Sequence, residues 1–127
     1  MPDSPRARSS ALPAVAVGTK AALRAADRLS ISNRVLARII GVSEASVSRW
    51  RSGRYVFNPN DKPFELALLF VRLYRALDAI VGGDDDAAAA WMNSENRALG
   101  ATPLALVQTV PGLMHVLHYL DARRALA

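Results

Sequence analysis

Apolar residues recur in this chain at intervals of three and four residues, and residues that start or stop helices separate one apolar stretch from the next. Signals for strands are nearly absent. The spacing predicts helices over residues 19–29, 33–40, 44–51, 62–81, 85–92, 103–108 and 113–124. The expected capping residues are Thr19, Ser32, Ser43, Asp84 and Thr102. The sequence therefore predicts an all-α fold with seven helices.

The charge is distributed unevenly along the 127 residues. Residues 1–60 hold ten Lys and Arg against three Asp and Glu, whereas residues 61–127 hold six against eight. A basic half beside a mildly acidic one indicates a nucleic-acid surface joined to a module with another task.

Residues 33–52 match the pattern of a helix-turn-helix, which needs a small residue where its helices cross and a glycine in its turn. Ala37 and Gly41 occupy these two positions. The positions that pack one helix on the other are apolar, namely Leu36, Ile40, Val42, Val47 and Trp50. Two ordinary helices joined by a glycine turn remain the alternative.

The second helix of this motif is expected to read DNA. If Val47 and Trp50 point inward, the outward side chains at 100° per residue are Glu44, Ala45, Ser48, Arg49 and Ser52, next to Ser43 at the helix start. Arg49 suits guanine O6 and N7, Ser48 suits either kind of base, and the Ala45 methyl suits thymine. Glu44 would accept from cytosine N4 or repel phosphates. Arg34, Arg51 and Arg54 are predicted phosphate contacts.

The composition restricts the compartment and the chemistry. The absence of cysteine excludes disulfides, thiolate nucleophiles and cysteine-bound zinc, and it suggests a reducing cytoplasm. No apolar run approaches the roughly 18 residues of a membrane span. Residues 1–17 are rich in Pro, Ser and Arg, and we expect a flexible arm there. We expect residues 18–82 to form the helix-turn-helix domain with a connecting helix and residues 83–127 a second domain.

The second half resembles a known family. The residues that carry the resemblance are Trp91-Met92, Asn93 to Ala98, Leu99-Gly100, Thr102-Pro103-Leu104, Leu106 and Tyr119-Leu120-Asp121-Ala122. Together they resemble the toxin-binding domain of Xre/MbcA/ParS antitoxins, a family that also has a helix-turn-helix upstream. The resemblance covers about residues 18–127. It implies a helix-turn-helix domain joined by a long helix to a small helical toxin-binding domain.

This resemblance implies an antitoxin of a type II toxin–antitoxin pair, without catalysis or cofactor of its own. The implied partner is a RES-domain toxin that consumes NAD by hydrolysis or phosphorolysis, or uses it for ADP-ribosylation. The antitoxin's terminal residues would obstruct the toxin's NAD cleft, while its N-terminal domain binds the operon's own promoter. We expect a homodimer, because such operators are usually read as paired half-sites.

The expected toxin-binding residues lie on the last helix and on Trp91. Tyr119 would be an aromatic anchor, Arg123 and Arg124 would bond acceptors in the cleft, and Leu126 would fill an apolar pocket. The terminal carboxylate on Ala127 would occupy a phosphate-binding position. His115 and His118 complete the predicted set and are expected at the surface or interface.

Two other functions remain open from the residues alone. One is a stand-alone dimeric helix-turn-helix transcription regulator with a C-terminal dimerisation or ligand-binding domain. The other is an enzyme, but two histidines and no paired carboxylates outside a helix start leave few groups for catalysis. Asp84, Asp85 and Asp86 are explained as a helix start and the histidines are too few for zinc, so we predict no metal site.

Overall fold

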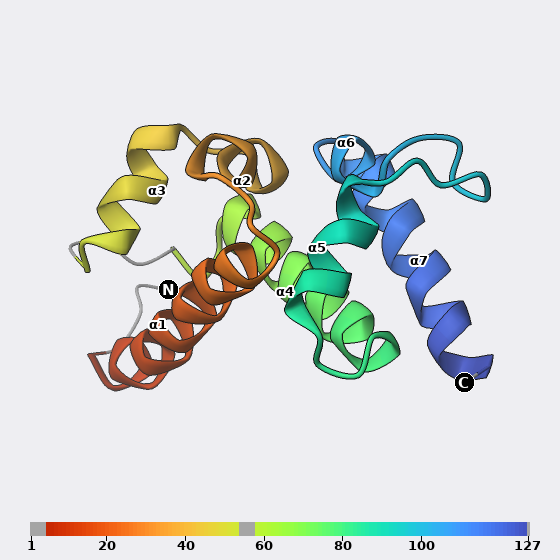
Figure 1. The fold of residues 1–127 in the computed structure, drawn as a ribbon. Coiled ribbons are helices and arrows are strands. Elements are labelled where there is room, and N and C mark those ends of the chain that lie inside the picture. The colour runs from red at the N-terminus through yellow and green to blue at the C-terminus, as the bar shows by residue number, and fades with distance from the viewer. Residues whose placement is uncertain (1–4, 54–57, 127) are drawn as a thin grey trace.

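The computed structural model describes residues 5–53 and 58–126, with side chains from residue 14 onward. Within these residues the chain is all α-helical, as predicted, and its only bridge of strand type joins Asn96 and Ala101. The helices in Figure 1 are α1 (Pro5–Arg28), α2 (Asn33–Ile40), α3 (Glu44–Arg51), α4 (Lys62–Ile80), α5 (Asp85–Asn93), α6 (Pro103–Leu106) and α7 (Val110–Leu126). None of them, over the described residues, has the length and apolar character needed to cross a membrane.

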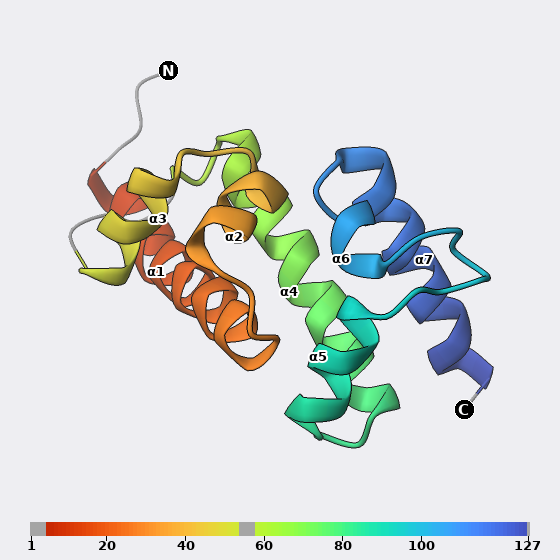
Figure 2. The ribbon, with the colours of Figure 1, turned by 45° about the horizontal axis from the view of Figure 1, so that its top comes forward.

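Helix α4 runs through the centre of the molecule and packs against α1 and α2 on one side and α5 and α7 on the other (Figures 1 and 2). A helix that is apolar over most of its circumference needs more than one neighbour, and α4 has neighbours on both sides. Its buried side chains include Leu66, Phe70, Leu73 and Leu77. One hydrophobic cluster therefore continues from the first half of the chain into the second.

Side-chain caps begin four of the helices at the residues that the sequence indicated. Each cap oxygen accepts a hydrogen bond from a backbone N–H three residues later, at 3.0–3.3 Å, and the caps are Ser32, Ser43, Asp84 and Thr102. Gly41 ends α2 with a φ of 74°, in the left-handed region that glycine adopts at little cost. Asp84 confirms that the aspartate cluster serves as a helix start.

The start of α1 differs from the prediction. Thr19 does not cap a helix; it is buried inside α1 and its hydroxyl donates to the Val15 carbonyl at 2.8 Å. The flexible arm expected over residues 1–17 is wrong for residues 5–17, which are helical, while residues 1–4 lie outside the described part. The physical reason is burial, because Val15 lies on the same helical face as Ala22 and Ala26 and this face packs in the core.

The last two helices also differ from the prediction at their ends. Helix α6 ends at Leu106 instead of Gln108, and α7 begins at Val110 and continues to Leu126. The hydroxyl of Thr109 accepts a hydrogen bond from the Gly112 N–H at 3.1 Å, so it acts as a cap and starts α7 early.

Tyr74 connects three helices where the two halves meet. Its hydroxyl accepts from Arg28 of α1 and lies 3.4 Å from carboxylate oxygens of both Asp78 on α4 and Asp85 on α5. Burial raises the pKa of the Tyr74 hydroxyl, so the group keeps its single proton, which it can donate to either carboxylate.

We expect Gly112→Ala to destabilise the fold. A Cβ at Gly112 would collide with the carbonyl oxygen of Leu106 and lie 2.7 Å from its carbon, and a backbone group cannot rotate away as a side chain can. The expected loss in free energy of unfolding is about 1–3 kcal/mol, measured by urea denaturation.

Gly18→Ala is the matched control, since its Cβ would meet the ring edge of Phe64 at 2.8 Å and that side chain can shift. Equal losses in the two variants would contradict the role assigned to Gly112.

Candidate functional site

The outer face of α3 is exposed as the helix-turn-helix pattern predicts. Val47 and Trp50 point into the core, and only 0% and 9% of their surfaces are exposed to solvent. The opposite face carries the exposed residues Glu44, Ala45, Ser48 and Arg49, and Ser43 and Ser52 are exposed at the two ends of α3. Helix α3 lies at the edge of the molecule farthest from α7 (Figure 1). This face is therefore open to a large partner.

Three serines form side-chain hydrogen bonds at the ends and in the middle of α3. The Ser43 hydroxyl caps the helix and lies 3.0 Å from the Ser46 hydroxyl, which accepts a hydrogen bond from Arg49 Nη2 at 3.2 Å. Ser52 donates to the Arg49 carbonyl at 2.7 Å. Ser46 was missed in the sequence, although its position three residues before Arg49 is the usual spacing for such a contact. It orients the guanidinium along the exposed face.

Arg51 has a different position from the one expected. Its Nη1 and Nη2 donate to the two carboxylate oxygens of Asp27 at 3.2 and 2.8 Å, and its Nε donates to Asn33 Oδ1 at 2.6 Å. The guanidinium is thus held by intramolecular contacts at the surface and fastens α3 to α1 and to the start of α2. A DNA phosphate would have to compete with a bidentate carboxylate.

The structure describes only one of the other two arginines that were predicted to contact phosphates. Arg34 is exposed on α2, beside α3. Arg54 lies outside the described residues.

Three of the residues expected to bind the toxin form one cluster. Trp91 of α5 stacks on Tyr119 of α7 with ring centroids 6.3 Å apart and planes 16° from parallel. The guanidinium carbon of Arg123 lies 5.8 Å from the centre of the Tyr119 ring, and its Nη1 donates to the Tyr119 hydroxyl at 3.2 Å. We call these three residues the aromatic cluster. Half-buried aromatic rings with an arginine are typical of residues that anchor protein interfaces.

The remaining predicted residues of α7 are more exposed. His115 and His118 face solvent, and Leu126 keeps 89% of its exposure. Ala127 lies outside the described residues. No group of three or more potential metal ligands occurs in the described part of the chain.

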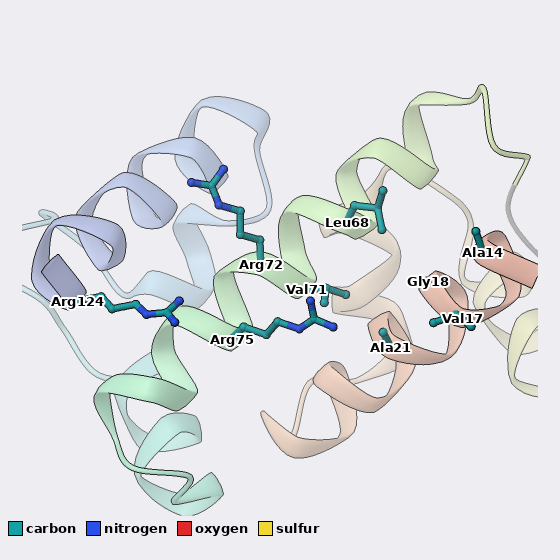
Figure 3. A pocket seen from close by; sticks show the side chains of 9 residues that line it. All are labelled: Ala14, Val17, Gly18, Ala21, Leu68, Val71, Arg72, Arg75 and Arg124. Atoms are coloured by element: carbon teal, nitrogen blue, oxygen red, sulfur yellow. The ribbon is translucent and has the colours of Figure 1, made fainter. Parts of the chain in front are cut away.

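Arg124 lies apart from the aromatic cluster. It lines a groove of about 430 Å³ together with Arg72 and Arg75 of α4 and small or apolar residues of α1 and α4 (Figure 3). We call this the α1–α4 groove. Arg72 also forms an ion pair of 2.6 Å with Asp121 of α7. The sequence did not predict the groove, because its residues come from three helices that are distant in the chain.

Two family models match the chain. The antitoxin Xre-like helix-turn-helix domain matches residues 9–72, and the antitoxin Xre/MbcA/ParS C-terminal toxin-binding domain matches residues 76–125. The two ranges meet within α4. The exposed face of α3 lies in the first range and the aromatic cluster in the second.

A solved structure has a similar fold over most of the chain. It is a chain of the crystal structure of the M. tuberculosis MbcT–MbcA toxin–antitoxin complex, with 26% sequence identity and a TM-score of 0.64. The match covers 84% of this chain and 93% of that chain. No curated protein matches the sequence. With a helix-turn-helix model over half of its length and a toxin-binding model over most of the rest, this chain belongs to the Xre/MbcA/ParS family of antitoxins.

Proposed function

We propose that this antitoxin blocks the NAD-binding cleft of a cognate RES-domain toxin with its C-terminal half and represses its own operon through α3. The observation that carries the proposal is the separation of two exposed surfaces. Helix α3 and the two helices that carry the aromatic cluster, α5 and α7, lie on opposite sides of α4, so one molecule would be able to hold DNA and toxin at once (Figure 1).

The α3 face has the side chains needed for direct readout in the major groove. Arg49, held along the helix by Ser46, would donate to guanine O6 and N7. Ser48 can bond either kind of base, the Ala45 methyl can contact thymine, and Glu44 can accept from cytosine N4. Ser43 and Ser52 complete this surface at the helix ends, and Arg34 and Arg54 are the proposed phosphate contacts.

We further propose that two copies read paired half-sites. Helix α3 has two turns and can read only a few base pairs, so a second α3 supplies the remaining specificity. The homodimer would then be part of a larger toxin–antitoxin complex on the operator.

We propose that the end of this protein's α7 obstructs the cleft of the toxin. Residues 123–126 are helical, so they would enter as a helix end with Leu126 exposed at its tip. Trp91 and Tyr119 would be the anchor behind it, with His115 and His118 on the exposed flank of α7. Arg123 is presented by its contact with Tyr119, and Ala127 would follow it into the cleft.

The first experiment tests the readout by α3. Arg49→Ala should reduce affinity for the operator by about 1–3 kcal/mol and relax the preference at one base pair, measured by fluorescence anisotropy with operator and random duplexes. Arg34→Ala is the control, because loss of a phosphate contact weakens both duplexes alike and lowers the salt dependence. Equal losses on both duplexes for Arg49→Ala would refute base readout by this residue.

The second experiment tests whether Arg51 positions α3 instead of contacting DNA. Asp27→Ala removes the carboxylate partner of Arg51 and also removes a negative charge from a DNA-binding domain. Electrostatics alone would increase the affinity for DNA, whereas a loosened α3 decreases affinity for the operator more than for random DNA. We expect the decrease, and we expect Arg51→Ala to add little further loss in the double variant.

An increase in DNA affinity for Asp27→Ala would contradict this role. The accompanying loss of stability should be small, about 0.2–1 kcal/mol, because both side chains are partly exposed.

The third experiment tests the obstruction of the cleft. A protein lacking residues 123–127 should lose inhibition of NAD consumption by the toxin encoded in the adjacent reading frame. The deletion removes Arg123 and the exposed Leu126 but no buried side chain of α7. Operator binding and the thermal midpoint of unfolding serve as controls for folding. If the shortened protein inhibits the toxin as well as the full chain does, the inhibiting contacts lie elsewhere in the C-terminal half.

A further inference from the structure

The α1–α4 groove combines an apolar floor with a basic rim (Figure 3). Helix α1 contributes the small residues Ala14, Gly18 and Ala21 to its wall, and Leu68 and Val71 of α4 lie opposite. Gly18 lies close to the Phe64 side chain, since a Cβ there would lie 2.8 Å from the ring. The lining residues of α1 span two helical turns, or about 10 Å.

The floor of the groove exposes apolar side chains to solvent. Val17 keeps 68% of its exposure and Leu68 keeps 45%. They are two of the four large apolar side chains that are exposed among the described residues, and they lie together here. Large apolar side chains that gather at one exposed place are typical of a protein interaction site.

Only one of the three arginines on the rim is paired with a carboxylate in the described part of the protein. Arg72 is paired with Asp121 at 2.6 Å. Arg75 and Arg124 have no hydrogen bond or ion pair with any described residue, and Arg124 extends over α4 beside Arg75 (Figure 3). Two guanidinium groups are therefore available to an acidic partner.

We propose that the α1–α4 groove receives an acidic and apolar segment of the toxin, which extends the toxin contact from the C-terminal half onto α1. This inference rests on the proposed function. Arg124 lies in the matched toxin-binding range, while Val17 and Leu68 lie in the matched helix-turn-helix range, so the groove continues the toxin-binding surface across the boundary.

The charge distinguishes the toxin from the other possible occupants. A second copy docked groove to groove would bring its own two unpaired arginines against Arg75 and Arg124. Duplex DNA would pair with the arginines of the rim but would leave the apolar floor without a partner. An acidic, apolar segment satisfies both the rim and the floor.

Because the chain contains no cysteine, single-cysteine variants test occupation of the groove directly. In Val17→Cys, addition of the toxin from the adjacent reading frame should slow labelling by a fluorogenic maleimide about tenfold. Ser48→Cys, exposed on α3, is the matched control, and its labelling rate should not change.

Affinity measurements test the two chemical features of the groove. We expect Arg75→Glu to weaken toxin binding about tenfold and to reduce its salt dependence, and Val17→Ser to weaken it without changing the salt dependence. Arg38→Glu makes the same charge change at an exposed position of α2 outside the groove, and its toxin affinity should stay within about twofold. Circular dichroism and the thermal midpoint report the folding of each variant.

The outcomes separate this inference from the proposed function. If the unaltered protein does not bind the toxin, the proposed function fails. If it binds and inhibits the toxin but the labelling of Val17→Cys and the affinity of Arg75→Glu are unchanged, the groove inference is wrong and the proposed function stands. Slower labelling of Val17→Cys at higher protein concentration without toxin would assign the groove to a second copy and overturn the inference.

Discussion

The burial of α4 on two sides is the constraint on which the rest of the structure depends. Phe70, Leu73 and Leu77 are fully buried between α1 and α2 on one side and α5 and α7 on the other. Each such side chain contributes about 1.5–3 kcal/mol when removed from water. Neither half of a chain this short has a large core of its own, so the two halves depend on the helix that they share. The boundary between the matched domains accordingly lies within α4.

Ionic and polar contacts orient the helices around this shared core. Arg51 ties α3 to α1, Tyr74 joins α1 to α4 and α5, and the Arg72–Asp121 pair joins α4 to α7. Exposed contacts of this kind add little to the free energy of unfolding. Their directional geometry nevertheless fixes the angles at which α3 and α7 are presented, and these two helices carry the proposed binding surfaces.

Residues along α7 contribute to the core and to two different surfaces. Leu113 and Leu117 pack in the core, Tyr119 joins the aromatic cluster, and Arg124 lines the α1–α4 groove. Successive residues of a helix are rotated by 100°, so Arg123 and Arg124 face different neighbours despite being adjacent. A toxin that contacts both Arg123 and Arg124 would bind α7 on two sides.

The sequence by itself determined the features that depend on neighbouring residues. Helices α2 to α5, the caps of α2, α3 and α5 and the inward direction of Val47 and Trp50 follow from hydrogen bonds and periodicity within a few positions. The motifs around Trp91 and Tyr119 likewise indicated the family before any fold was known. Local patterns were sufficient for the helices and their caps because each of these is stabilised within one helix or one turn.

Tertiary structure alone decided the features that join distant parts of the chain. Burial of Val15 against the core made residues before Thr19 helical, although Pro13 and the polar composition predicted an arm. The partner of Arg51 lies 24 residues away, and the partner of Arg72 lies 49 residues away. Whether an exposed arginine meets DNA, a carboxylate or a groove depends on which helices pack beside it, and that packing is settled by the burial of apolar faces over the whole chain.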